Sequence, residues 1–122
     1  MENMENMGII AIKPERVSRA LLENVFYPVT AVVSLDDQGG IISAELYDTE
    51  FCVDAVREAA GCCEVWMMTN HPDGDRALSE QDIYNAAILK SRMHGRMVRV
   101  FVTGEDIGCV EVPLTEGQKA AG

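Results

Sequence analysis

Two runs of alternating hydrophobic and polar residues flank a short segment rich in turn-forming residues. In residues 29–35 every second position is Val, Ala or Leu, and residues 41–47 repeat the pattern with Ile42, Ala44 and Leu46. Alternation of this kind has the period of a half-buried β-strand. The segment between the runs ends in Gly39-Gly40, which supplies the turn chemistry of a hairpin. The pattern therefore predicts an antiparallel hairpin over residues 29–47.

Hydrophobic residues recur at helical spacing in three other segments. The first begins at Pro14, which is tolerated in a first helical turn, and we expect it to end at Pro28. The third begins at Ser79, which forms a capping box with Asp82 three residues later, and Gly95 closes it. A second helix is predicted over about residues 49–60, and short apolar runs predict strands over residues 8–12, 65–69, 97–102 and around 109–112.

The order of these elements predicts an α+β fold. The first six follow a ferredoxin-like βαββαβ plan, with helices on one face of an antiparallel sheet. The last three form an additional α-β-β extension that extends the sheet or covers its open face. The alternative is a small OB-like barrel capped by the third helix. We expect one domain over residues 8–115, with loose segments at residues 1–7 and 116–122.

Length and composition indicate a protein with one hydrophobic core. The 122 residues are 48% hydrophobic, and no apolar run approaches the roughly 20 residues of a membrane-spanning helix. The first residues are polar and acidic, unlike the basic start of a signal peptide. The four cysteines have no C-x-x-C spacing, so we expect them to be reduced and buried. These features favour a cytoplasmic protein without a cofactor.

The charge is strongly negative and unevenly distributed. The net charge of −10 disfavours direct binding to nucleic acid or to an acidic membrane. Residues 36–64 hold eight acidic side chains and only one base, Arg57. Residues 90–99 reverse this pattern and contain bases but no acid.

Two groups of basic residues are candidates for binding an anion. The first surrounds the end of the third predicted helix and consists of Arg92, His94, Arg96 and Arg99. The second lies at the start of the first predicted helix and consists of Lys13, Arg16 and Arg19. Such cations could instead complement the helix dipole or contact the acidic surface of another copy of the chain. Several guanidinium groups at one helix end would suit a phosphate or carboxylate.

The segment from His71 to Arg76 contains the other candidate chemistry. His71, Asp73 and Asp75 are candidates for holding a divalent cation or for acid–base work. The simpler interpretation is a Pro-Asp-Gly surface turn whose polar residues are solvated. The chain has no phosphate loop, no dinucleotide fingerprint, and neither a G-x-S-x-G nor an H-E-x-x-H motif.

These observations favour binding over catalysis. We expect a non-enzymatic module, assembled as a homo-oligomer, that senses or sequesters a small anionic molecule such as a nucleotide-like compound. The alternative is an acidic interaction protein that competes with nucleic acid for a basic protein partner.

Overall fold

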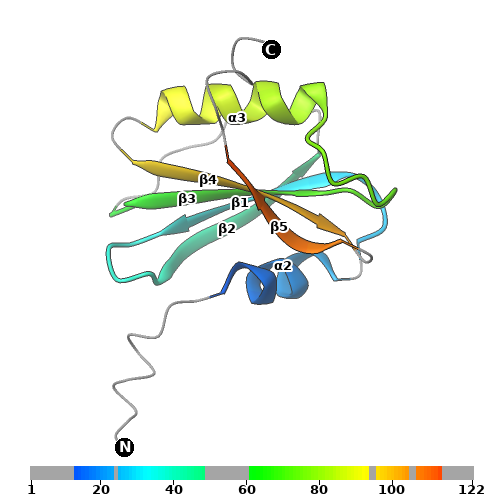
Figure 1. The fold of residues 1–122 in the computed structure, drawn as a ribbon. Helices are drawn as coiled ribbons and strands as arrows, with labels where there is room; N and C mark the ends of the chain where they lie inside the picture. Colours follow the sequence, from blue (N-terminus) through cyan, green and yellow to red (C-terminus); the bar gives the residue numbers. More distant parts are fainter. Residues whose placement is uncertain (1–12, 24, 49–60, 94–95, 105–106, 114–122) are drawn as a thin grey trace, which may run out of the picture.

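A five-stranded mixed β-sheet with a helix on each face forms the framework of the fold (Figure 1). The computed structural model describes residues 13–23, 25–48, 61–93, 96–104 and 107–113. Its elements in chain order are α2 (Pro14–Leu22), β1 (Val29–Leu35), β2 (Ile41–Asp48), β3 (Glu64–Asn70), α3 (Glu80–Arg92), β4 (Met97–Gly104) and β5 (Gly108–Val112). The predicted strand at 8–12 and the predicted helix at 49–60 lie outside the described residues.

The strands are arranged in the order β2-β1-β3-β4-β5. β1 runs antiparallel to both β2 and β3, β3 runs parallel to β4, and β4 runs antiparallel to β5. α3 connects the two parallel strands across one face of the sheet, and α2 lies on the opposite face (Figure 1). This arrangement confirms the predicted α+β class.

The structure contains α3, β4 and β5 in the order predicted for the α-β-β extension. Its strands extend the sheet, and its helix covers a face. The ferredoxin-like plan for the first six elements stays a prediction, because two of those elements are outside the described residues. The barrel alternative also stays a prediction, although β2 and β5 are the two edges of the described sheet.

The predicted hairpin is confirmed as β1 and β2. The strands pair from Val29 with Asp48 to Ser34 with Ser43, and a β-bulge shifts the register at Leu35. The Asp36 carboxylate accepts hydrogen bonds from the backbone N–H groups of Gln38 and Gly40, at 2.9 and 2.8 Å. Gly39 has a φ of +82°, which glycine adopts without strain.

The start of each described helix follows its sequence signal, but the end of α2 does not. Pro14 opens α2, and the Ser79–Asp82 capping box opens α3 as predicted. However, α2 ends at Leu22 rather than continuing to Pro28. The Asn70 side chain donates to the carbonyls of Val25 and Tyr27 at 3.2 and 3.0 Å. These bonds tie the residues before β1 to the end of β3.

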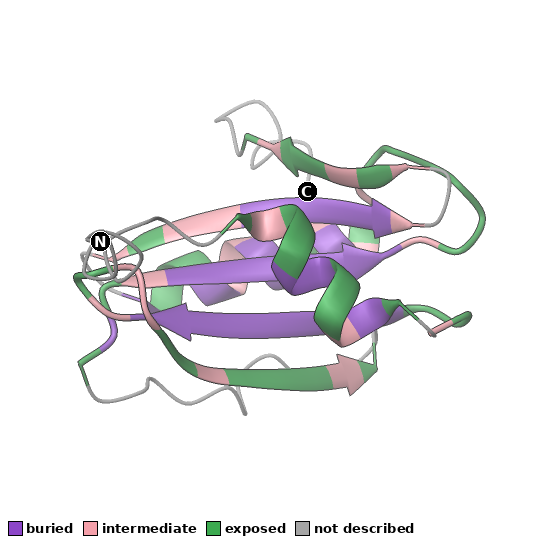
Figure 2. Ribbon diagram, turned by 90° about the horizontal axis from the view of Figure 1, so that it is seen from below, coloured by how far each residue is buried: buried purple, intermediate pink, exposed green. Residues whose placement is uncertain are grey.

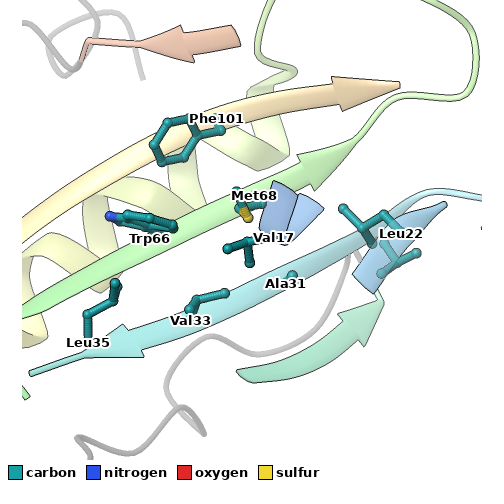
Figure 3. Packing of buried hydrophobic residues seen from close by; sticks show 9 residues of the cluster. Val17, Leu22, Ala31, Val33, Leu35, Trp66, Met68 and Phe101 are labelled. Carbon is teal, nitrogen blue, oxygen red and sulfur yellow. The ribbon is translucent and has the colours of Figure 1, made fainter. Parts of the chain in front are cut away.

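The hydrophobic core has two parts, one on each face of the sheet. Val32, Met67, Leu89 and Val100 belong to the part beneath α3. The other part lies beneath α2, and its side chains project from β1, β3, β4 and α2, as Figure 3 shows. The central strands are mostly buried, whereas the edge strands β2 and β5 are mostly exposed (Figure 2).

Trp66, Met67 and Met68 illustrate how both faces of β3 are used. Their exposed fractions are 3%, 0% and 0%, which confirms that they belong to the core. Neighbouring residues on a strand point to opposite faces. Trp66 and Met68 accordingly pack beneath α2, while Met67 packs beneath α3.

The described cysteines only partly match their prediction. Cys62, Cys63 and Cys109 are free thiols as expected, but only Cys62 is buried. Cys63 is exposed, because adjacent residues of an extended segment point in opposite directions. Neither of the described helices is long and apolar enough to cross a membrane.

Candidate ligand-binding site

Several polar residues that are joined by hydrogen bonds lie where β3 and β4 end. His71 directly follows β3, and its backbone N–H donates to the carbonyl of Thr103 in β4 at 2.8 Å. Parallel strands end at the same edge of a sheet, and loops beyond that edge commonly carry binding sites. The chain then runs through residues 72–79 to the start of α3.

His71 is fixed by hydrogen bonds at both ring nitrogens. Its Nε2 lies 2.7 Å from Oδ2 of Asp82, and its Nδ1 lies 2.6 Å from the carbonyl oxygen of Asp75. The His71 side chain is 12% exposed and that of Asp82 is 1% exposed. The imidazole therefore links the loop after β3 to the first turn of α3.

Asp82 connects three elements through one buried carboxylate. Its Oδ1 accepts a hydrogen bond from the Thr69 hydroxyl at 2.9 Å. Its Oδ2 accepts from the backbone N–H of Ser79 at 3.1 Å, which completes the capping box of α3. A buried carboxylate needs several donors to offset the loss of water. Asp82 obtains these donors from β3, from the helix cap and from His71.

The two acceptors around His71 favour the doubly protonated ring. A carbonyl oxygen and a carboxylate oxygen both accept, so each ring nitrogen supplies an N–H. Burial lowers the pKa of His71, but the hydrogen bonds to Asp82 and to the Asp75 carbonyl, with the negative charges of Asp82 and Asp73, outweigh it. The net result is a raised pKa for His71. The two acceptors and the raised pKa both favour the protonated ring, which is placed to pair with the buried Asp82 carboxylate.

A groove on the α3 side of the strand ends, here called the α3-side groove, is bordered by His71 and Asp82. Its apolar wall includes Phe26, Pro28 and Leu46, and its other lining residues are Tyr47, Asp48, Thr69, Asn70, Pro72, Asp73, Asp75, Ala77, Ser79 and Gln81. None of these described lining residues is Lys or Arg. The groove therefore joins an apolar wall to a negatively charged rim.

Tyr47 contributes a neutral phenol to this groove. Its hydroxyl donates to the Glu45 carboxylate. Burial and the interactions with Glu45 raise the pKa of Tyr47 to about 12. The phenol therefore stays protonated at neutral pH and keeps its proton directed toward Glu45.

A second hollow, here called the α2-side recess, lies on the other side of the same strand ends. It is lined by Glu15, Ser18, Arg19, Leu22, Glu23, Val25, Phe26, Asn70, Pro72, Thr103, Gly104 and Gly108. Phe26, Asn70 and Pro72 border both hollows. These residues therefore form the shared wall between the two hollows.

Of the basic residues expected to bind an anion, Arg99 has a structural role. Its Nε and Nη2 donate to the two carboxylate oxygens of Glu111 at 3.0 and 2.8 Å, and its Nη1 lies 3.2 Å from Glu64. The guanidinium also lies 5.7 Å from the Trp66 ring centroid and 5.3 Å from that of Phe101. Both rings belong to the core beneath α2.

The structure does not bring Arg92 and Arg99 together. Arg92 ends α3, which covers the opposite face of the sheet from Trp66 and Phe101. Arg96 donates from Nε to the carbonyl of Cys62 at 2.8 Å, and His94 lies outside the described residues. Arg92 and Arg99, two members of the expected cluster, therefore belong to opposite faces of the sheet.

The basic residues near the start of α2 are more accessible. Lys13 is the N-cap residue of α2, and Arg16 and Arg19 are exposed on the helix. Among the six expected anion-binding residues that the structure describes, only Arg19 lines either hollow. The structure therefore points to Arg19 as the member of the set beside a recess.

The candidate metal ligands form separate contacts. Asp73 accepts from the backbone N–H of Asp75, and Asp75 accepts from that of Ala77, at 3.0 and 2.9 Å. His71 binds Asp82 instead of joining them. No group of three or more His, Cys, Asp or Glu side chains suited to a metal ion occurs in the described part of the chain.

Sequence reasoning did not identify Asp82 and Thr103 as residues that line the two hollows. Asp82 was identified only as a capping residue, although the strand that ends before His71 and the helix that starts at Ser79 place the two side chains near each other. Thr103 carries no sequence signal beyond its position at the end of a strand. Thr103 lines the α2-side recess because α2 lies beside it.

Comparisons with known proteins do not assign a function, so the proposals below are argued from the geometry. No protein-family model matches the chain, and no curated protein matches it.

Proposed function

We propose that this protein is a non-enzymatic module that binds a small molecule in the α3-side groove. The observation that supports the proposal most directly is the combination of an exposed apolar wall with a fixed polar edge. Phe26 is 72% exposed and Leu46 is 48% exposed, and both line the groove that His71 and Asp82 border. Ligand sites typically combine apolar contact area with a few fixed polar groups.

The charge of the groove favours a ligand that carries hydrogen-bond donors or a positive charge. Asp48, Asp73 and Asp75 are exposed at its rim. His71, the only basic side chain among the described lining residues, is already hydrogen-bonded to Asp82. An amine or amidine attached to an aromatic ring would match both the carboxylates and the apolar wall.

The hydrogen bonds of His71 favour binding over proton transfer. A general base needs a ring nitrogen within reach of the substrate proton. In His71 one nitrogen is bonded to Asp82 and the other to the Asp75 carbonyl. The imidazole is therefore placed to hold the wall of the groove in position.

A series of probes that differ only in charge tests this proposal. Benzamidine and benzylamine carry a cation, benzyl alcohol is neutral and benzoate is an anion. We expect the cations to raise the melting temperature most, since ligands that bind the native state stabilise it. We also expect them to perturb amide resonances of residues 71–79 in NMR titrations. If neither cation produces a saturable change, the proposal is wrong.

Two matched variants distinguish the groove from the general surface. Phe26→Ala removes an exposed aromatic ring of the groove, whereas Tyr84→Ala removes a 60% exposed ring on α3 that does not line it. We expect Phe26→Ala to weaken probe binding and Tyr84→Ala to leave it unchanged. Equal effects of the two variants would contradict the assignment of the groove.

A second candidate function is association with a basic protein partner. Asp37, Glu45 and Asp48 are exposed on β2 or on the turn before it, whereas Glu64 is occupied by Arg99 and Trp66. If this function is right, affinity for the partner falls steeply with added salt, because exposed charges are screened. Pull-down assays at low and high salt with Glu45→Gln test it. Failure to recover a basic protein at low salt would reject it.

We also propose that the small-molecule-binding module assembles as a homo-oligomer. β2 is at one edge of the sheet formed by the described strands, and its Ile41 and Leu46 are 43% and 48% exposed. Edge strands with apolar side chains readily pair with another chain. Sedimentation at several protein concentrations tests this expectation, and a monomer at every concentration would contradict it.

A further inference from the structure

The α2-side recess contains a buried hydroxyl that lacks a partner. Thr103 is 3% exposed, and its Oγ1 has no hydrogen-bond partner in the described part of the protein. Buried polar groups are nearly always hydrogen-bonded, so such a group calls for an explanation. Thr103 points to the α2 face of the sheet, as Phe101 does two residues earlier, and it lines the recess.

The other polar groups of the recess come mainly from α2. Ser18 donates its hydroxyl to the Glu15 carbonyl at 3.1 Å. Asn70 is occupied by the carbonyls of Val25 and Tyr27. These groups are therefore engaged within the protein, which leaves the Thr103 hydroxyl and the charged side chains of α2 to face a ligand.

The charged groups of the recess have both signs. Arg19 is exposed at its border, with Glu15 four residues before it and Glu23 four residues after it. Residues four apart lie on the same side of a helix. A simple anion would meet Arg19 but also two carboxylates, and a simple cation would meet the guanidinium. A ligand that carries both charges avoids either conflict.

We propose that the α2-side recess binds a small zwitterion of the free α-amino acid class. The ligand carboxylate pairs with the Arg19 guanidinium and accepts from the Thr103 hydroxyl, while its ammonium faces Glu15 and Glu23. The recess has a volume of about 470 Å³, within the roughly 300–1,000 Å³ usual for small-ligand sites. This proposal does not depend on the function proposed for the α3-side groove, because its polar groups differ.

NMR titration with the common L-amino acids, each at millimolar concentration, tests the proposal. We expect at least one of them to cause saturable shifts in the amide resonances of Thr103, Gly104 and Gly108. Propionate and ethylamine, which each keep only one charge of alanine, should shift the same resonances far less than a zwitterion that binds. The proposal is overturned if no amino acid binds, or if a one-charge analogue binds as tightly as the best amino acid.

Arg16 provides a matched control for Arg19. Both arginines are exposed on α2, but only Arg19 lines the recess. We expect Arg19→Gln to weaken amino-acid binding about tenfold or more, since a charge-assisted hydrogen bond is lost. Arg16→Gln should leave the affinity unchanged. Equal affinities of the Arg19→Gln variant and the original protein would reject the site.

Thr103→Val separates the role of the hydroxyl from that of the fold. Valine keeps the shape of threonine and removes the unpartnered oxygen, so we expect a variant that folds at least as stably as the original. Its affinity for the amino acid should fall severalfold. A stable Thr103→Val variant with unchanged affinity would remove Thr103 from the site and would overturn the proposal as stated.

Discussion

His71 and Asp82 are separated by 11 residues in the chain and joined by a 2.7 Å hydrogen bond. The bond connects the end of β3 to the first turn of α3, and the second nitrogen of His71 holds the Asp75 carbonyl at 2.6 Å. One imidazole thus bridges the loop and the helix cap. Its protonation state therefore affects both elements.

The raised pKa of His71 predicts that the protein loses stability as the pH rises. The folded-state pKa lies above the ordinary histidine value of about 6.5, which applies to the unfolded chain. The stabilisation is therefore fully present below about pH 6.5 and is lost as the pH rises through the folded-state pKa. Chemical denaturation at a series of pH values, with NMR titration of the imidazole, measures this.

The variant His71→Gln serves as the control for this pH dependence. Glutamine cannot titrate, so the fall in unfolding free energy above about pH 6.5 should disappear from the variant. The groups that face His71 are the Asp82 carboxylate, the Asp75 carbonyl and the nearby charge of Asp73. If the variant shows the same decline, another group causes it.

Asp82→Ala should be among the most destabilising substitutions in the described part of the chain. It leaves His71, the Thr69 hydroxyl and the Ser79 N–H without their acceptor. Breaking a buried charge pair by removing one partner typically costs about 3–5 kcal/mol of unfolding free energy. Urea denaturation measures the change.

The conservative variant Asp82→Asn identifies the source of this cost. Asparagine keeps one acceptor oxygen but removes the negative charge that pairs with His71. We therefore expect an intermediate loss and a lower pKa for His71. An unchanged His71 titration in Asp82→Asn would show that the ion pair does not control it.

Interactions between residues close in the sequence could be predicted, whereas those between distant segments could not. The Ser79–Asp82 cap and the Asp36 turn are local, so the sequence alone predicted both the start of α3 and the hairpin. The bond from Asp82 to His71 depends on where β3 ends relative to α3, which no local pattern specifies. The sequence therefore indicated a solvated turn where the structure has His71 hydrogen-bonded to the buried Asp82 carboxylate.

The same reasoning explains the basic residues. The bases around the end of the third helix form one run in the sequence, but Arg92 and Arg99 belong to opposite faces of the sheet. The pairing of β3 with β4 places Arg99 near Glu64, and the pairing of β4 with β5 places it near Glu111. Pairings between strands depend on sheet order, and the sequence did not specify that order.

The pair between Arg99 and Glu111 should contribute little to stability through charge alone. The Glu111 side chain is 43% exposed, and exposed ion pairs typically contribute less than about 1 kcal/mol. We expect Glu111→Gln to lower the unfolding free energy by less than this amount, with a smaller effect at high salt. The hydrogen bonds to Arg99 lower the pKa of Glu111, so the contribution is also lost as the pH falls through that value.

Arg99→Ala should cost more than Glu111→Gln, because it also removes contacts with Trp66 and Phe101. Those rings pack edge to face with centroids 5.5 Å apart, and the guanidinium lies near both. We expect a loss of about 1–2 kcal/mol, since the stacking contribution adds to that of the ion pair. Thermal and urea denaturation of the two variants should therefore differ. Equal losses would show that ring stacking adds nothing.

Asn70→Ala should destabilise the protein and loosen the wall that both hollows share. Asn70 is 4% exposed, and its side-chain amide donates to the carbonyls of Val25 and Tyr27 between α2 and β1. Its removal leaves both carbonyls without this donor, at a cost of about 1–3 kcal/mol. Hydrogen exchange should report faster exchange at the Val25 amide, which donates to the Leu22 carbonyl at 3.1 Å, whereas the exposed turn variant Gln38→Ala should leave its protection unchanged. If Asn70→Ala retains full protection there, the side chain is not what ends α2 at Leu22 and directs the chain into β1.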